Sequence, residues 1–154
     1  MSIKPISCKV SDSGVLEVGG VLASELISEY GSPLYVMDAE TLKQNCLDYI
    51  DTFKEAEADA VVAYASKALL TVGVAKFMAN LGMGFDVCSG GEIYTILQAG
   101  VDTETVYFHG NNKSYDELEL AIKNQIRIVV DNQDELDRIL EISQKKKAQA
   151  RVLV

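Results

Sequence analysis

The chain has 154 residues, of which 48% are hydrophobic and 24% are charged, and it contains only two prolines. This composition is typical of a folded globular domain with a sizeable core and excludes a disordered chain. The formal net charge of −9 argues against nucleic acid or an anionic membrane surface as a partner. No apolar run approaches the length of a membrane span, and the three cysteines lack a metal-binding spacing. We therefore expect free thiols in a reducing compartment, the cytoplasm.

Residues 1–30 differ in pattern from the remainder of the chain. Leu16–Val18 predicts a short strand that turns at Gly19–Gly20 to form a hairpin. Leu22–Tyr30 then carries apolar residues at helical spacing. Two parts are therefore expected, an N-terminal segment 1–30 and a regular region 31–154.

Strands and helices alternate in the regular region. Six apolar strands are predicted, at Leu34–Met37, Ala60–Ser66, Phe85–Cys88, Thr105–Phe108, Arg127–Val130 and Ala150–Val154. Four of the intervening helices have an expected N-cap, at Asp38, Ser89, Ser114 and either Asp131 or Asn132. Such units fit either an open doubly wound sheet or an incomplete (β/α)₈ barrel. A barrel that lacks strands leaves sheet edges unpaired, so for a barrel the chain is expected to be a fragment.

A single cation, Lys67, ends the apolar run Ala60–Ser66. Lysine is rarely buried without a partner or a task, and α/β folds bind ligands at the carboxyl edge of the sheet. A lysine at the end of a strand can also simply extend its charge into solvent, and the position of Lys67 fits this interpretation as well as it fits a functional one. It also fits a phosphate-binding cation or a Schiff-base amine. Burial among Tyr64, Ala65 and Ala68 would favour the neutral amine that attacks a carbonyl group.

Asp86 lies near the end of the next predicted strand, between Phe85 and Val87. A carboxylate in an apolar strand costs free energy unless it is paired or hydrogen-bonded. Neighbouring strands of a sheet lie about 5 Å apart, so Asp86 and Lys67 are expected to face the same region. A plain polar residue at a strand end is an equally good interpretation.

Four further positions have simpler explanations than catalysis. Ser89–Glu92 places two glycines at a helix start, where anions bind, but a capping box explains this run better than a phosphate cradle does. Cys88 is expected to be a small buried residue at a strand end, and Lys113 a solvated loop charge. His109, the only histidine, is a candidate ligand contact, but no nearby histidine or cysteine would complete a metal site.

Three motifs, taken in order, carry a resemblance to a known family. They are Tyr64-Ala-Ser-Lys67-Ala, Gly82-Met-Gly-Phe-Asp86-Val-Cys-Ser-Gly-Gly-Glu92 and Phe108-His-Gly-Asn-Asn-Lys-Ser114. With Val18–Val21 and Tyr30–Val36 upstream, the chain resembles the N-terminal portion of the diaminopimelate decarboxylase family. These are pyridoxal-phosphate-dependent enzymes with an alanine-racemase-like barrel. The resemblance implies an α/β fold, a partial (β/α)₈ barrel with roughly six of the eight units.

The same resemblance implies an activity and a set of residue roles. The activity is decarboxylation of an amino-acid substrate, meso-2,6-diaminopimelate, to L-lysine, with pyridoxal 5'-phosphate as cofactor, in a homodimer. Lys67 would hold the cofactor covalently, and Asp86 would be the acid close to that lysine and the cofactor. His109 and Asn111 lie in a motif beside the pocket without an assigned role. Residues 1–30 would supply a strand to a C-terminal β domain.

Two other functions stay open at this point. A non-catalytic protein of the same barrel superfamily would bind pyridoxal phosphate through Lys67 without turning over an amino acid. An open-sheet α/β binding module would instead use Lys67 to contact a phosphate group. The family's ring-stacking histidine, glycine-rich phosphate loop and substrate arginines are expected beyond residue 154. This chain also has Leu69 where many members of the family have asparagine.

Overall fold

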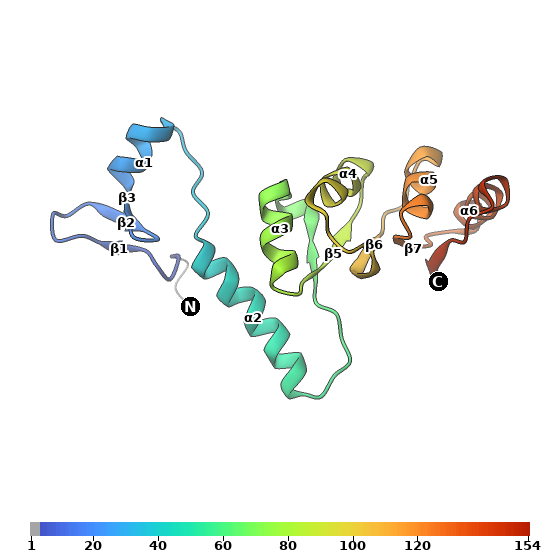
Figure 1. Ribbon diagram of the computed structural model, residues 1–154, viewed down its shortest axis with the longest axis horizontal. Helices are drawn as coiled ribbons and strands as arrows, with labels where there is room; N and C mark the ends of the chain where they lie inside the picture. Colours follow the sequence, from blue (N-terminus) through green and yellow to red (C-terminus); the bar gives the residue numbers. More distant parts are fainter. Residues whose placement is uncertain (1–3) are drawn as a thin grey trace. The chain divides into compact units, whose positions relative to one another are not determined.

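The computed structural model describes residues 4–154, and the polypeptide divides into two units, Met1–Thr52 and Phe53–Val154. The division falls inside the helix α2 (Ala39–Glu55). Each unit has its own sheet, and each is therefore described by itself (Figure 1).

The first unit contains a three-stranded antiparallel sheet. Its strands are β1 (Lys9–Val10), β2 (Leu16–Val18) and β3 (Val21–Leu22), in the order β1-β2-β3. Gly19 and Gly20 join β2 to β3 with φ of 60° and 82°, a left-handed conformation that two-residue hairpin loops require and glycine adopts without strain. The helix α1 (Ala23–Tyr30) follows. The predicted strand, turn and helix are thus confirmed, whereas β1 was not predicted.

The predicted strand at Leu34–Met37 is wrong. These residues form irregular chain between α1 and α2 and pair with no strand of residues 4–154. An apolar run becomes a strand only where a neighbour accepts and donates its backbone hydrogen bonds. The predicted cap at Asp38 is confirmed, because its Oδ2 accepts the N–H of Thr41 at 3.0 Å at the start of α2. Its Oδ1 accepts the hydroxyl of Ser7 at 2.6 Å.

The second unit contains a five-stranded parallel sheet, in which each strand pairs with the next strand of the sequence. The strands are β4 (Ala63–Ala65), β5 (Gly84–Val87), β6 (Val106–Phe108), β7 (Arg127–Val129) and β8 (Arg151–Leu153). The helices between them are α3 (Val72–Asn80), α4 (Gly90–Ala99), α5 (Tyr115–Lys123) and α6 (Gln133–Lys146), with short 3₁₀ turns η1 (Ser66–Ala68) and η2 (Thr103–Thr105). Strand and helix alternate along the green-to-red part of Figure 1. The α/β class is confirmed, with five of the six predicted strands in the sheet.

The core of this unit lies where the central strands meet the helices. Fully buried side chains come from the strands (Phe85, Val87, Val106, Phe108, Ile128) and from the helices (Ile93, Ile96, Leu118, Ala121, Ile142). Apolar residues on successive strand positions are typical of parallel strands that are covered by helices. Because the core fixes β5, β6 and β7, it also fixes the edge at which these strands end.

Polar caps determine where the helices begin. Ser114 Oγ accepts the N–H of Glu117 at 3.3 Å, and Glu117 Oε2 accepts the N–H of Ser114 at 2.9 Å, which is the reciprocal capping box predicted for α5. Asn132, rather than Asp131, caps α6 by accepting the N–H of Glu135 at 2.9 Å. A fixed helix start sets the length of the loop that leads from each strand end.

The cap at Asp38 predicts an acid-sensitive step in the first unit. Hydrogen bonds from Ser7 and Thr41 lower the pKa of Asp38 from 3.8 to about 2. Since the folded carboxylate holds its proton less tightly than the unfolded one, its stabilising effect is complete above about pH 4 and is lost as the pH falls toward 2. Amide hydrogen exchange at Thr41, corrected for intrinsic rates, should rise over this range. Asp38→Asn should remove that rise, and Asp12→Asn, at an exposed turn, should keep it. An unchanged profile in Asp38→Asn would contradict the assignment.

A close approach at Gly84 predicts a packing defect in the second unit. A Cβ atom at this position would lie 2.7 Å from the carbonyl oxygen of Thr105 and 2.8 Å from Cγ1 of Val61. Gly84→Ala should therefore lower the free energy of unfolding by about 1–3 kcal/mol, as overpacking does. Gly73→Ala is the matched control, because a Cβ there meets only Thr71 Oγ1 at 3.9 Å. Urea unfolding measures both variants, and equal midpoints would contradict the expected clash.

Candidate functional site

The carboxyl ends of β4, β5 and β6 form the edge at which the candidate residues collect. Ala65 is in register with Asp86, and Val87 with Phe108. The N–H of His109 continues the ladder by donating to the carbonyl oxygen of Val87 at 2.9 Å. Parallel pairing therefore brings Lys67, Asp86 and His109 to one edge of the sheet.

Lys67 lies in the 3₁₀ turn η1 directly after β4, and its side chain is exposed. The burial that would favour a neutral amine is not present in this structure, because strand β4 ends at Ala65 and Lys67 lies two residues further on, in the turn. Its neighbour Ser66 is buried, and the hydroxyl of Ser66 has no hydrogen-bond partner among residues 4–154. A buried hydroxyl without a partner costs free energy, so a polar group that bound here would be favoured.

Asp86 contacts the only histidine of the chain. Its Oδ1 lies against Nδ1 of His109, in an ion-pair contact without the alignment of an N–H hydrogen bond. Both side chains are about one-third exposed, at 32% and 33%. Asp86 is thus half-buried and faces an imidazole.

Cys88 lies close enough to Lys67 and Asp86 for both charges to affect the pKa of its thiol. Partial loss of water around the sulfur atom raises the pKa of the Cys88 thiol, although the residue as a whole is exposed. The carboxylate of Glu92 raises this pKa further, Lys67 opposes the shift, and Asp86 adds to it. Both charges therefore lie near the thiol, as expected for residues at the same carboxyl edge of the sheet. The expectation that Cys88 is buried is wrong, since β5 ends one residue earlier, at Val87, and Cys88 is exposed in the loop.

The N-terminus of α4 is occupied by carboxylates. Ser89 Oγ accepts the N–H of Glu92 at 3.3 Å, whereas Glu92 Oε2 accepts the N–H of Cys88 at 2.6 Å, so the predicted capping box forms only in part. Glu117 Oε1 accepts the N–H of Gly90 at 2.7 Å. Burial raises the pKa of Glu117, but hydrogen bonds from Ser114 and Gly90 outweigh it and lower the pKa overall. A phosphate group at this helix start would have to compete with two carboxylates, which already accept the N–H groups of Cys88 and Gly90.

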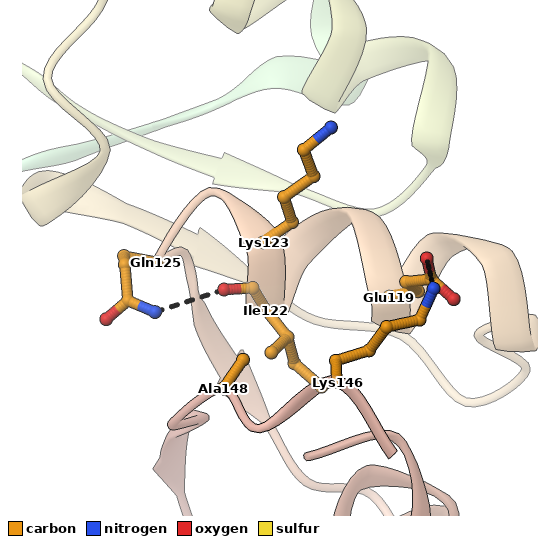
Figure 2. Close-up of a pocket in the computed structure, with 6 residues that line it drawn as sticks. All are labelled: Glu119, Ile122, Lys123, Gln125, Lys146 and Ala148. Carbon is orange, nitrogen blue, oxygen red and sulfur yellow. Dashed lines mark hydrogen bonds and ion pairs between the residues drawn. The ribbon is translucent and has the colours of Figure 1, made fainter. Parts of the chain in front are cut away.

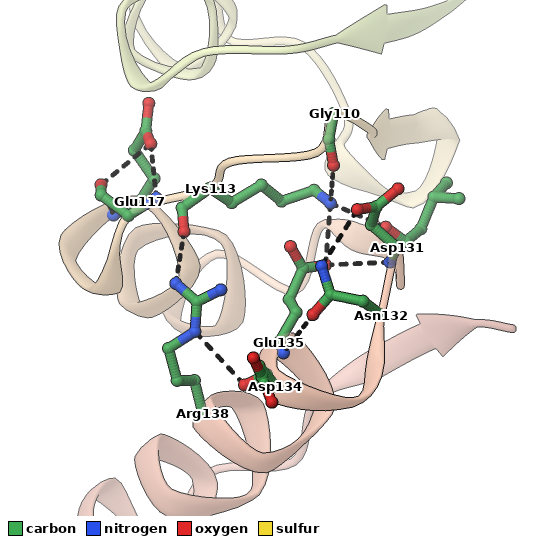
Figure 3. A network of polar contacts seen from close by, with 10 residues as sticks. Gly110, Lys113, Glu117, Asp131, Asn132, Asp134, Glu135 and Arg138 are labelled. Carbon is green, nitrogen blue, oxygen red and sulfur yellow. Dashed lines mark hydrogen bonds and ion pairs between the residues drawn. The ribbon is translucent and has the colours of Figure 1, made fainter.

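Lys113 is the largest departure from the sequence analysis. It was predicted to be a solvated loop charge, yet it is only 2% exposed. Its Nζ donates to the carbonyl oxygens of Gly110 and Val129 at 2.7 and 2.8 Å, and to Oε1 of Glu135 at 2.8 Å. Figure 3 shows this ammonium group between the loop after β6 and the start of α6. The prediction failed because the three acceptors come from three separate segments.

Glu135 was not singled out from the sequence. It occupies the third position of α6, where an acid is normally a solvated capping residue, but its side chain is fully buried. Its Oε1 also accepts the N–H of Asp131 at 3.3 Å. Arg138, one turn further along α6, donates to the carbonyl oxygen of Lys113 at 2.7 Å. No local sequence signal distinguishes Glu135 from the other acids of this helix.

A cavity of about 430 Å³ lies away from these residues (Figure 2). It is lined by Glu119, Ile122, Lys123, Gln125, Lys146 and Ala148. Gln125 and Ala148 precede β7 and β8, so the cavity is at the amino edge of the sheet, opposite the edge of Lys67. Lys146 forms an ion pair with Glu119 at 2.5 Å there. We therefore place the candidate site at the carboxyl edge and not in this cavity.

Relatives of known name are similar to almost the whole chain. Diaminopimelate decarboxylase of Bacillus methanolicus is 46% identical over 147 residues, which is 95% of this chain and 34% of that protein. The enzyme of the same name from Halalkalibacterium halodurans is 43% identical over the same shares. A crystal structure of diaminopimelate decarboxylase from M. jannaschii in complex with L-lysine has a TM-score of 0.89 at 35% identity, over 96% of this chain and 35% of that one.

The chain spans about a third of the length of the curated relatives that it matches, 34% of each of the first two. The structural match confirms the predicted fold, because the similar region of those enzymes belongs to their barrel. Residues 41–154 match the family described as "Pyridoxal-dependent decarboxylase, pyridoxal binding domain". This chain therefore belongs to the pyridoxal-dependent decarboxylases, of which it carries the pyridoxal-binding domain region.

Proposed function

We propose that this chain forms part of an amino-acid decarboxylase that converts meso-2,6-diaminopimelate to L-lysine with pyridoxal 5'-phosphate. The observation that carries the proposal is the accessible amine of Lys67 at the carboxyl edge, beside Asp86 and His109. The names of the similar proteins and the L-lysine bound in one of them support the substrate class.

The residues at the edge fit the carbonyl end of pyridoxal phosphate. Lys67 offers an exposed primary amine, and Ser66 beside it carries a buried hydroxyl without a partner among residues 4–154. An amine that reacts with a carbonyl must lose a proton, and lysine does this where arginine does not. When bound, the cofactor supplies an electron sink for the electrons released as carbon dioxide departs. Lys67 would hold the cofactor covalently, and the edge would orient it.

Asp86 would support Lys67 and the cofactor without breaking the bond itself. Its half-buried carboxylate lies at the strand end next to Lys67 and contacts His109. A carboxylate in this position favours a positive charge nearby, whether on Lys67, on His109 or on the bound cofactor. Asn111, which follows in the same loop, is exposed and keeps no assigned role.

The phosphate end of the cofactor would be bound elsewhere. The helix start nearest to Asp86, that of α4, is occupied by the carboxylates of Glu92 and Glu117. Negative charge at that position repels a phosphate. We therefore propose that the phosphate contacts come from the two-thirds of the similar proteins that this chain does not match.

Three wider features complete the proposal. Residues 1–30 would be a segment that pairs with a β domain, and residues 31–154 would be the incomplete barrel. The complete protein would be a homodimer in the cytoplasm, a reducing compartment in keeping with the three free cysteines. Among residues 4–154, no helix has the length and apolar character needed to cross a membrane.

The role of Lys67 can be tested by spectroscopy of the complete gene product with pyridoxal phosphate. Lys67→Ala should abolish the absorbance band near the visible region, the borohydride-stabilised label on this residue and nearly all turnover. Lys67→Arg should do no better, because arginine stays protonated. Lys76→Ala, at an exposed position of α3, is the matched control and should behave like the parent. A normal band in Lys67→Ala would exclude the proposed attachment, and a normal band without turnover in the parent would favour a non-catalytic binding protein.

The role of Asp86 can be tested by removing its charge and keeping its size. Asp86→Asn should weaken cofactor affinity and slow turnover without unfolding the protein, because the carboxylate stabilises positive charge at the edge. Asp59→Asn, in an exposed loop, controls for the loss of one acid. Cofactor titration and steady-state rates measure both variants. If affinity and rate stay at the parent values, Asp86 is only a polar residue at a strand end.

A further inference from the structure

The ammonium group of Lys113 uses all of its hydrogen-bonding capacity inside the protein. Its three N–H donors meet three acceptors, the carbonyl oxygens of Gly110 and Val129 and the carboxylate of Glu135. The ring of Phe108 lies 5.5 Å from the same nitrogen. With every donor satisfied and the side chain buried, Lys113 binds no ligand and acts as no nucleophile. Any role of Lys113 must therefore come from the three segments that its hydrogen bonds connect.

Two of these segments are rigid and the third is a turn. Val129 ends the central strand β7, and Glu135 lies in the first turn of the long helix α6. Gly110 belongs to the loop after β6, with φ of 122°, and a Cβ atom there would lie 3.8 Å from the carbonyl oxygen of Cys88. Lys113 therefore connects the loop after β6 to strand β7 and helix α6. The connected part of the loop lies near Cys88, which follows β5.

The residue immediately before Gly110 is His109, whose ring contacts Asp86. The backbone of His109 is fixed on one side by its bond to Val87. On the other side, the bond from Lys113 to the carbonyl oxygen of Gly110 fixes the peptide that follows Gly110. A glycine with a positive φ has several accessible conformations, and this second bond is present in the conformation in which the imidazole contacts Asp86.

Stability alone does not account for this buried ion pair. Replacing both partners of a buried pair by well-packed apolar side chains is often neutral or stabilising, because the charges no longer have to leave water. The bond from Lys113 to Gly110 has no apolar equivalent, since an alkyl group cannot hold a carbonyl oxygen. The pair is therefore better explained by the turn that it holds than by the free energy of unfolding.

We propose that Lys113, held by Glu135, is a positioning residue that fixes the His109–Gly110 turn and so keeps His109 in contact with Asp86. The catalytic relevance of this contact rests on the proposed function, whereas the contact itself does not require the cofactor. The contacts of the pair are with Gly110, Val129, Asp131 and Arg138, and not with Lys67.

The test uses the imidazole Cε1–H resonance of His109 in the 154-residue chain, where one histidine gives one unambiguous signal. Asp86→Asn should shift this resonance in the parent. The double variant Lys113→Met with Glu135→Leu removes both charges and keeps the side-chain volume. In this background, Asp86→Asn should shift the His109 resonance by less than half as much as it does in the parent. Lys123→Met, at an exposed position of α5, should leave the effect unchanged.

A second variant separates the tether from the charge pair. Glu135→Gln keeps a hydrogen-bond acceptor and leaves the bond from Lys113 to Gly110 in place, so the response of His109 to Asp86→Asn should persist. An undiminished response in the double variant, or its loss in Glu135→Gln, would overturn the proposal. A double variant that loses its helical circular dichroism would overturn it too, because the pair would then serve the whole fold.

Binding of pyridoxal phosphate is measured separately from the His109 resonance, so the proposed function and the positioning role can fail independently. If the complete gene product binds no pyridoxal phosphate and the resonance in the 154-residue chain behaves as expected, the proposed function fails and the positioning role stands. If the complete gene product binds the cofactor and the double variant retains the full Asp86 response, the positioning role fails alone.

Discussion

The parallel pairing of β5 with both of its neighbours is the constraint on which the second unit depends. The register that sets Ala65 opposite Asp86 and Val87 opposite Phe108 brings three strand ends to one edge. Side chains alternate along a strand, so a slip of one residue would direct Asp86 to the other face of the sheet. Lys67 and His109 reach the same edge because each follows its strand after only one or two residues. The strand register therefore brings the three candidate residues to one edge, whatever contacts their side chains then make.

The charges at this edge fall into two groups that differ in exposure. Lys67 is exposed, and Asp86 and His109 are about one-third exposed, at 32% and 33%, so water and ligands can reach them. Lys113 and Glu135 are buried, and their Coulomb attraction is strong in an interior of low dielectric constant. The buried pair is shielded from water, whereas the outer three side chains are in contact with it. Strand β6 and the turn at Gly110 connect the two groups.

The sequence predicted what depends on local order and missed what depends on distant contacts. Apolar periodicity located β4 to β8 and their helices, and Ser114 was predicted as a cap because a capping box is a local pattern. Cys88 was placed wrongly because one residue at a strand end decides between core and loop. Leu34–Met37 has strand-like composition, but composition does not supply a pairing partner. Lys113 was misjudged because its acceptors lie up to 22 residues away in the sequence. Lys67 and Asp86 were predicted as candidates because charged residues at strand ends interrupt apolar runs, and the structure brings both to the carboxyl edge of the sheet.

The arrangement of acids at the start of α4 limits what this edge can recognise. Helix N-termini normally attract anions, but here the N–H groups of Cys88 and Gly90 are bound by Glu92 and Glu117. An incoming phosphate would have to displace a carboxylate from its hydrogen bond and would meet the other at close range. The net charge of −9 adds to the same repulsion at long range. The only exposed cation of the edge triad, Lys67, is better suited to react with a carbonyl group than to hold a doubly charged anion by itself. The N–H groups of Cys88 and Gly90 are therefore not free to bind an anionic group at this edge.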